Sequence, residues 1–179
     1  MFYQCITIKP LLTNSNIILS EDIFPRLHSL FVKNGSIFGI SFPEYTYIKH
    51  GRIGNKVNIL CEDKESLRKL NLADIFNTNE EISVDNTIYE TQQFQLFCRI
   101  RENAHTNRYI NRLKKRHIFF SNEDEPIING HIKSHNRKIF SHAYIKLKSG
   151  STKQSFNLFI KPVITDHPSF NSYGLVINP

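Results

Sequence analysis

The stretch S-E-D-I-F-P-R-L-H-S-L-F-V-K-N-G, residues 20–35, runs directly into S-I-F-G-I-S-F, residues 36–42. Ser20 followed by two acids is typical of a helix N-cap, and Asn34-Gly35 is typical of a helix end, so a helix is predicted over residues 21–33. Its apolar positions recur at helical spacing and predict a buried stripe: Ile23, Leu27, Leu30 and Phe31. The apolar residues after Gly35 predict a strand over residues 36–42.

Further strands and a second helix flank this stretch. Strands are predicted over residues 2–9, 55–61 and 82–89, a helix over 63–71, and a polar loop between residues 42 and 55. The resulting order, β-α-β-β-α-β, is the ferredoxin-like arrangement. We therefore expect an α+β fold whose residues 1–92 form an N-terminal ferredoxin-like domain.

The second half of the chain is less regular. Strands are predicted over residues 93–101, 142–148 and 154–160, a short basic helix over 106–118 and loops over 121–139, and residues 172–177 close the chain. Residues 93–179 are expected to form a smaller C-terminal α+β domain that carries the basic helix.

Positive charge is concentrated in that second half. The 179 residues hold 23 Lys and Arg against 16 Asp and Glu, a formal charge of +7. Residues 1–94 contain 9 basic and 11 acidic residues, whereas residues 95–179 contain 14 basic and 5 acidic ones. A basic surface attracts polyanions and releases their counterions on binding, so this asymmetry favours nucleic acid as a partner. General solubility is the alternative interpretation.

The basic helix sharpens this interpretation. On a helical wheel its cationic residues share one arc, beside an arc of apolar residues that would dock the helix: Arg108, Arg112, Lys115 and Arg116. Like charges four residues apart destabilise an isolated helix by roughly 0.2–0.5 kcal/mol per pair. Such repulsion is expected in a helix that binds an anion. Arg99 and Arg101 would extend the patch from the preceding strand. DNA and an RNA hairpin both remain possible ligands.

Several classes of protein are disfavoured. No apolar run approaches the roughly 18 residues of a membrane span, and the amino terminus does not resemble a secretion signal. The three cysteines, Cys5, Cys61 and Cys98, are far apart and predict buried thiols in a reducing cytoplasm. His131 and His135 lack the accompanying ligands of a zinc site, so no metal is expected.

Two features suit chemistry on a phosphate. His28 lies at the border of the first helix's apolar stripe, where a side chain is held by packing yet reaches a ligand; capping a neighbouring carbonyl is the alternative. The turn K-S-G-S-T-K, residues 148–153, places hydroxyls between two lysines. Such a turn suits a phosphate, and ordinary hairpin chemistry would also explain it.

Four segments in this order resemble the type I-F CRISPR repeat-processing endoribonuclease family, and the resemblance covers nearly the whole chain. They are R-L-H-S-L-F with G-I-S-F-P, residues 26–31 and 39–43; R-I-R-E-N-A-H-T-N-R-Y-I-N-R-L-K-K-R-H, residues 99–117; L-K-S-G-S-T-K-Q-S-F-N-L-F-I, residues 147–160; and S-Y-G-L, residues 172–175. Arg101 departs from the family, which uses glutamine there.

The resemblance implies a role for each matching residue. His28 takes the place of the catalytic histidine, Ser149 that of the serine holding the attacking 2′-hydroxyl, and Tyr173 that of the tyrosine orienting the histidine. The other matches imply RNA contacts: Arg99, Arg108, Arg112, Lys115, Arg116, His117 and Phe156. Arg101, beside Arg99 in the charge patch, and the turn hydroxyls of Ser151 and Thr152 are further predicted RNA contacts. Phe156 also alternates with Leu158 and Ile160 as a strand's core face would.

The resemblance implies a metal-independent enzyme without a cofactor that cuts CRISPR repeat RNA at the 3′ base of its hairpin. It then stays on the hairpin, together with the backbone and other subunits of a type I-F surveillance complex in a prokaryotic cytoplasm. An RNA-hairpin-binding subunit that does not cleave is the alternative, and a DNA-binding regulator is a more distant one.

Overall fold

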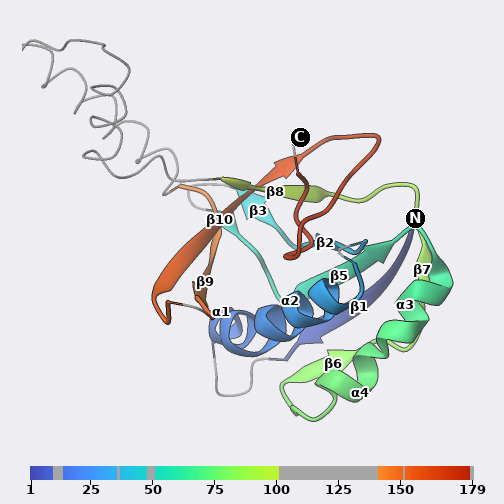
Figure 1. Cartoon of the computed structure of the whole chain (residues 1–179), viewed down its shortest axis with the longest axis horizontal. Coiled ribbons are helices and arrows are strands. Elements are labelled where there is room, and N and C mark those ends of the chain that lie inside the picture. The colour runs from blue at the N-terminus through green and yellow to red at the C-terminus, as the bar shows by residue number, and fades with distance from the viewer. Residues whose placement is uncertain (10–13, 36, 48–50, 101–140, 151, 178–179) are drawn as a thin grey trace, which may run out of the picture.

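The computed structural model describes residues 1–9, 14–35, 37–47, 51–100, 141–150 and 152–177 (Figure 1). Helices and antiparallel sheets are combined in this part of the chain, which confirms the predicted α+β class. The helical segments are α1 (Ser15–Ile18), η1 (Leu19–Ile23), α2 (Phe24–Lys33), α3 (Lys64–Leu70) and α4 (Leu72–Phe76). The strands are β1 (Phe2–Ile8), β2 (Gly39–Ser41), β3 (Thr46–Tyr47), β4 (Gly51–Arg52), β5 (Lys56–Cys61), β6 (Ile82–Val84), β7 (Tyr89–Glu90), β8 (Leu96–Ile100), β9 (Tyr144–Lys148) and β10 (Ser155–Val163).

The larger sheet has the strand order β2-β5-β1-β6, and β7 pairs with β1 at the other end of that strand from β6, at Phe2 and Tyr3. All its pairings are antiparallel, with Ile6 opposite both Val57 of β5 and Val84 of β6. Along β1 the side chains of Ile6 and Ile8 are buried at alternate positions, as expected for a strand with one face on a core. The ferredoxin-like assignment itself stays a prediction.

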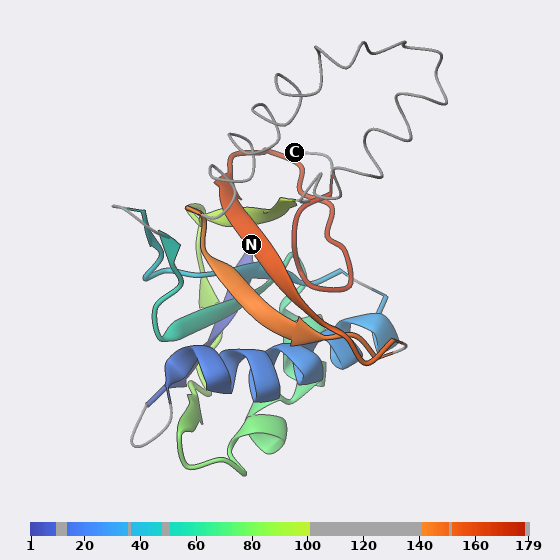
Figure 2. The same cartoon turned by 90° about the vertical axis from the view of Figure 1, so that its left-hand side faces the viewer.

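A second antiparallel sheet has the order β8-β10-β9. Figure 2 shows β9 and β10 crossing above the helix that α1, η1 and α2 form, and β9 contacts η1.

The short pair β3 and β4 lies within the region predicted to be a polar loop. The local sequence pattern does not predict this pair, because the pair depends on a tertiary contact: the Gly51 N–H donates to the Ser141 carbonyl at 2.9 Å.

The first helix begins earlier than predicted. Asn14, and not Ser20, is the N-cap, and its Oδ1 accepts a hydrogen bond from the Asn16 N–H at 2.9 Å. Ser20 lies inside the helix, where its hydroxyl donates to the Ile17 carbonyl. The π-helical turn η1 ends at Ile23, two residues before Pro25, whose ring would collide with the Glu21 carbonyl in a regular α-helix. The wider turn lets the helix continue past the proline.

The second helix agrees with its predicted position and has an unpredicted continuation. Asp63 caps α3 by accepting from the Ser66 N–H at 2.8 Å. At Asn71 the backbone is left-handed, with φ of 48°, and α4 follows at once. Leu72 and Phe76 of α4 are buried, so this extra turn adds to the core.

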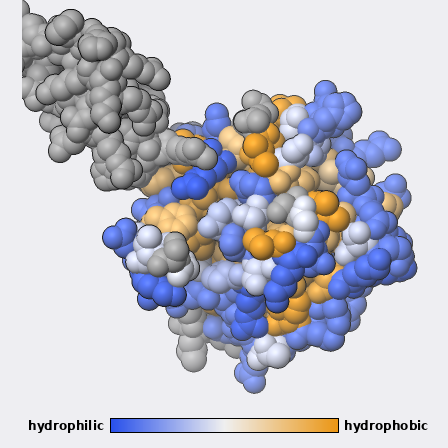
Figure 3. Space-filling model, in the orientation of Figure 1, coloured by the Kyte–Doolittle hydropathy of each residue, from blue (hydrophilic) through white to orange (hydrophobic). Residues whose placement is uncertain are grey.

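One cluster of buried apolar side chains draws on both sides of the predicted domain boundary at residue 92. It includes Leu27 and Phe31 of α2 together with Leu147 of β9 and Leu158 of β10. On the face shown in Figure 3 hydrophilic side chains cover most of the surface. The division into two domains stays a prediction; the shared core keeps α2 and the β9–β10 hairpin in place relative to each other.

The cysteines are free thiols, but only two of the three are buried as predicted. Cys61 and Cys98 are buried, whereas Cys5 is half-buried because it points to the less covered face of β1. Burial raises the pKa of all three thiols, so they are held in their protonated form.

Candidate active site

The border position predicted for His28 is confirmed. Its neighbours Leu27 and Phe31 on α2 are buried at 1% and 0% exposure, whereas His28 is half-buried. Burial lowers the pKa of His28 below the usual value of about 6.5. The helix therefore supplies an imidazole that stays neutral, and able to accept a proton, at physiological pH.

Tyr173 reaches the same imidazole from the other end of the chain. The two rings are stacked, with 4.4 Å between centroids and 29° between planes. Tyr173 lies in a turn near the C-terminus, where the predicted closing segment 172–177 makes single bridges between Val176 and both Cys98 and Phe170. Segments from both ends of the sequence thus meet at His28.

The turn predicted over residues 148–153 joins β9 to β10. The Ser149 N–H donates to the Gln154 carbonyl at 2.9 Å, and the Lys153 N–H donates back to the Ser149 carbonyl at 3.0 Å. The Ser149 hydroxyl oxygen accepts from the Thr152 N–H at 3.2 Å. Lys153 has a left-handed backbone, with φ of 58°, which closes the turn. The serine oxygen is therefore fixed by the backbone of its own hairpin.

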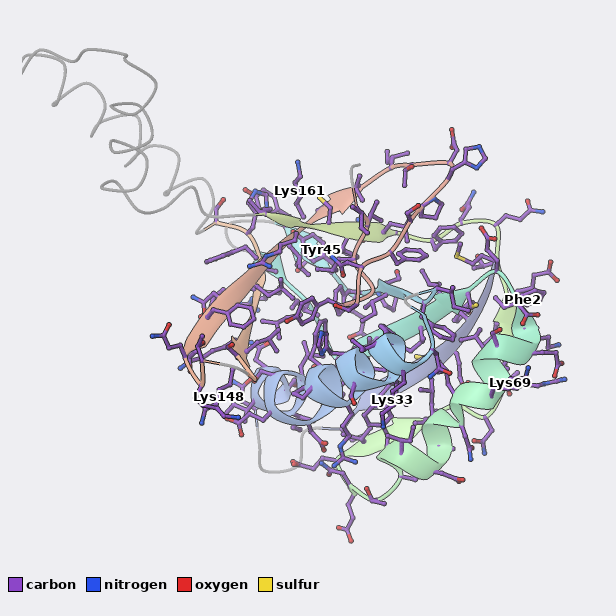
Figure 4. The ribbon with its side chains drawn as sticks, in the orientation of Figure 1. Phe2, Lys33, Tyr45, Lys69, Lys148 and Lys161 are labelled. Atoms are coloured by element: carbon purple, nitrogen blue, oxygen red, sulfur yellow. The ribbon has the colours of Figure 1, made fainter. Side chains whose placement is uncertain are left out.

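A cleft of about 910 Å³ brings these groups together. It lies between the helix and the β9–β10 hairpin and is lined by Ser20, Glu21, Phe24, Pro25, His28, Lys146, Leu147, Lys148, Ser149, Gly150, Lys153, Ser155 and Tyr173. In Figure 4 Lys148 projects from the end of β9 beside the helix. The three residues that the resemblance assigned to catalysis, His28, Ser149 and Tyr173, all line this one cleft.

The cleft is rich in cations. Lys146, Lys148 and Lys153 line it, and among the described residues no ion pair involves any of the three. Glu21 is the acid in the same lining set. Three ammonium groups that line the same cleft as a half-buried imidazole create a positive potential that suits a phosphate ester.

Arg99 and Phe156 contact each other, and neither is among the residues that line the cleft. The Arg99 guanidinium carbon lies 5.9 Å from the centroid of the Phe156 ring, within the range of a cation–π contact. Phe156 is half-buried and packs on the main core, while Leu158 and Ile160 are fully buried, so its core-face prediction is confirmed. Arg99 itself is exposed.

Other predicted contact residues lie outside the described part of the chain. These are Arg101, Arg108, Arg112, Lys115, Arg116, His117 and Ser151, together with the whole predicted helix over residues 106–118. Thr152 is exposed at the hairpin turn. The paired histidines His131 and His135 also lie outside.

Sequence reasoning missed Glu21 and Lys146 as lining residues. Lys146 carried a usable signal, because Ala143, Ile145 and Leu147 are buried at alternate positions and Lys146 therefore faces away from the core. Glu21 carried none, since it was interpreted as a first-turn acid of a helix that in fact begins six residues earlier, at Ser15.

The described residues lack a metal cluster and a membrane-spanning helix. No group of three or more His, Cys, Asp and Glu side chains is placed to hold a metal ion in the ranges that the structure describes. Within the same ranges, no helix has the length and apolar character needed to cross a membrane.

Comparisons with known proteins identify the family. Comparison with curated proteins gave no match. The model of the family described as CRISPR-associated protein (Cas_Csy4) matches residues 3–178 of the 179. The match spans His28, Ser149 and Tyr173 alike. The chain therefore belongs to the Cas_Csy4 family, the type I-F CRISPR endoribonucleases that process repeat RNA.

Proposed function

We propose that this chain is a metal-independent endoribonuclease that cleaves CRISPR repeat RNA at the 3′ base of its hairpin. The observation that carries the proposal is the single cleft shared by His28, Ser149 and Tyr173, three residues from distant parts of the sequence. The family match supports repeat-RNA processing, and the cleft supports the chemistry.

The proposed reaction uses the RNA's own nucleophile. The neutral His28 imidazole accepts the proton of a 2′-hydroxyl, and the 2′-oxygen attacks the adjacent phosphorus. The bond from phosphorus to the 5′-oxygen breaks, the leaving oxygen takes up a proton from solvent water, and a 2′,3′-cyclic phosphate remains. A positioned base of this kind contributes roughly 10²–10⁴-fold to the rate. The lowered pKa of His28 keeps the base in its active form.

Ser149 and the lysines act on the same substrate atoms in this proposal. The Ser149 oxygen, fixed by the Thr152 N–H, holds the 2′-hydroxyl in line for attack. Lys146, Lys148 and Lys153 offset the negative charge that builds on the phosphate oxygens. Charge stabilisation by ammonium groups and proton transfer by an imidazole together account for catalysis without a metal ion.

Recognition of the hairpin is assigned to the basic half of the chain. Arg112 and Arg116 of the predicted helix contact base edges of the stem, with Arg108, Lys115 and His117 in support. Arg99 and Arg101 recognise a base near the foot of the stem, and Phe156 stacks under the terminal pair. Ser151 and Thr152 hold the RNA near the cut. The product hairpin stays bound, and the protein becomes a subunit of a type I-F surveillance complex.

The test uses a panel of type I-F repeat hairpins in buffer containing EDTA. The proposal predicts one cut at the 3′ base of the stem, a product ending in a 2′,3′-cyclic phosphate, and no cut when the nucleotide before the scissile bond is 2′-deoxy. The deoxy hairpin must still bind with unchanged affinity. Loss of cleavage in EDTA, or a cut in the deoxy substrate, contradicts the mechanism. Binding without cleavage of any hairpin would favour the non-cleaving subunit.

A further inference from the structure

A compact turn holds Tyr173 in place. The Asn171 side-chain oxygen accepts hydrogen bonds from the backbone N–H groups of Tyr173 at 2.8 Å and Leu175 at 3.2 Å. The Asn171 backbone closes the same turn, because its N–H donates to the Leu175 carbonyl and its carbonyl accepts from the Gly174 N–H. One asparagine therefore orders the backbone on both sides of Tyr173.

Gly174 joins this turn to the helix that carries His28. Its backbone is left-handed, with φ of +71°, and a Cβ there would stand 2.6 Å from Cγ1 of Ile40 and 2.9 Å from Cε2 of Phe31. The Gly174 carbonyl accepts from the Ile40 N–H at 2.9 Å. Phe31 is one helical turn beyond His28 on α2, so the turn and the helix touch at two successive places: Gly174 on Phe31, and Tyr173 on His28.

We propose that Asn171 and Gly174 are positioning residues that hold the Tyr173 ring against His28. The inference rests on the proposed function for its catalytic meaning, but its structural content concerns the free protein alone. Neither residue lines the cleft among the described residues, so each acts through Tyr173. Their task is to fix the imidazole's orientation and to cover one of its faces.

The covered face has an electrostatic consequence. The charged and titratable groups that line the cleft around His28 are Glu21 of η1, Lys146 and Lys148 of β9, Lys153 of the hairpin turn and Tyr173. Desolvation by burial is what lowers the His28 pKa. If the turn loosens and the Tyr173 ring leaves, water reaches the imidazole and the pKa of His28 returns toward its usual value.

The decisive experiment measures the His28 pKa and cleavage in the same variants. Asn171→Ala removes the side-chain acceptor, Asn171→Ser keeps a shorter neutral one, and Asp85→Ala is the matched control. The Asp85 side chain accepts from the Thr87 N–H in a similar turn away from the cleft. The His28 resonance is assigned as the histidine resonance that disappears from the NMR spectrum in His28→Asn. Its titration midpoint is measured in the free protein, without RNA.

We expect the His28 midpoint to rise in Asn171→Ala, to rise less in Asn171→Ser and to stay unchanged in Asp85→Ala. Cleavage of a type I-F repeat hairpin should fall by about 10- to 100-fold in Asn171→Ala, as expected when a catalytic group is misplaced by about 1 Å. An unchanged midpoint and rate in a folded Asn171→Ala protein would overturn the proposal. Thermal unfolding shows whether the variant is folded, and the Asn171→Ser protein carries the same comparison if Asn171→Ala is not.

A double-mutant cycle separates positioning from a general structural effect. If Asn171 acts through Tyr173, adding Asn171→Ala to Tyr173→Ala causes no further loss of cleavage. A second loss as large as in the wild-type background contradicts the proposal. If the wild-type protein cleaves no hairpin but the His28 midpoint rises in Asn171→Ala, the proposed function is refuted and the positioning role stands. If the wild-type protein cleaves normally in EDTA but the His28 midpoint does not change in Asn171→Ala, the positioning role is refuted and the proposed function stands.

Discussion

The aromatic ring of Tyr173 is stacked on the imidazole of His28, with 4.4 Å between the ring centroids. The contact covers one face of the imidazole, and His28 and Ser149 line the same cleft. A proton acceptor that is half-buried and held by a ring, and that lies beside three lysines, is suited to act on an RNA phosphodiester.

The first prediction concerns pH. A base must be neutral, and burial depresses the His28 pKa, so cleavage should rise with pH and reach half its maximum below the usual histidine value of about 6.5. The measurement is kcat/KM against pH at constant ionic strength, which reports the free enzyme. A rate that keeps rising about tenfold per pH unit above 7 would indicate hydroxide, and not His28, as the base.

The second prediction concerns Ser149→Ala. Because the Ser149 oxygen sits in the cleft and is fixed by the Thr152 N–H, its loss should slow cleavage and leave hairpin affinity unchanged. Single-turnover kinetics and a gel shift on the same hairpin check the two quantities. A large loss of affinity with an unchanged cleavage rate would make the hairpin turn a binding element instead.

The third prediction concerns the basic helix. Arg112→Ala or Arg116→Ala should weaken hairpin binding by about 1–3 kcal/mol, the range for a lost bidentate contact to a base. Their like-charged spacing supports this expectation. Titration of a labelled hairpin at fixed salt measures the effect. Wild-type affinity in both variants would show that this helix face is merely solvated.

The fourth prediction separates the observed helix cap from the one that the sequence predicted. Asn14→Ala should destabilise the protein by about 0.5–2 kcal/mol, because it removes the cap of α1. Ser20→Ala should change stability by less than about 0.5 kcal/mol, since Ser20 lies inside the helix. Urea unfolding of the two variants side by side provides the measurement. The reverse order would place the helix start at Ser20.

The sequence allowed prediction of the parts that depend on local pattern. The buried positions Ile23, Leu27 and Phe31 of the first helix, the helix predicted over residues 63–71 and the turn between β9 and β10 all follow from periodicity and turn chemistry. The predicted start of the first helix was wrong because Ser20 resembles an N-cap. The helix in fact runs through Ser20, and the π-helical turn lets it continue past Pro25. The β3–β4 pair was missed because tertiary contacts, at Gly51, stabilise it.

The site could be predicted only in pieces. Helical spacing placed His28 at the edge of the core, and hydroxyls between lysines marked the turn at Ser149. The meeting of Tyr173 with His28 has no local signal, since it depends on the C-terminal turn packing onto α2 through Gly174 and Phe31. Only the family resemblance anticipated a role for Tyr173, and the contacts of Asn171 appear in the structure alone.

The most direct test compares wild-type protein and His28→Ala on one type I-F repeat hairpin in EDTA. The single-turnover cleavage rate is measured at a protein concentration that saturates the hairpin in both cases. We predict that wild-type protein cleaves, and that His28→Ala is slower by about 10²–10⁴-fold with unchanged hairpin affinity. Cleavage by His28→Ala at the wild-type rate would contradict the assignment of His28 as the base.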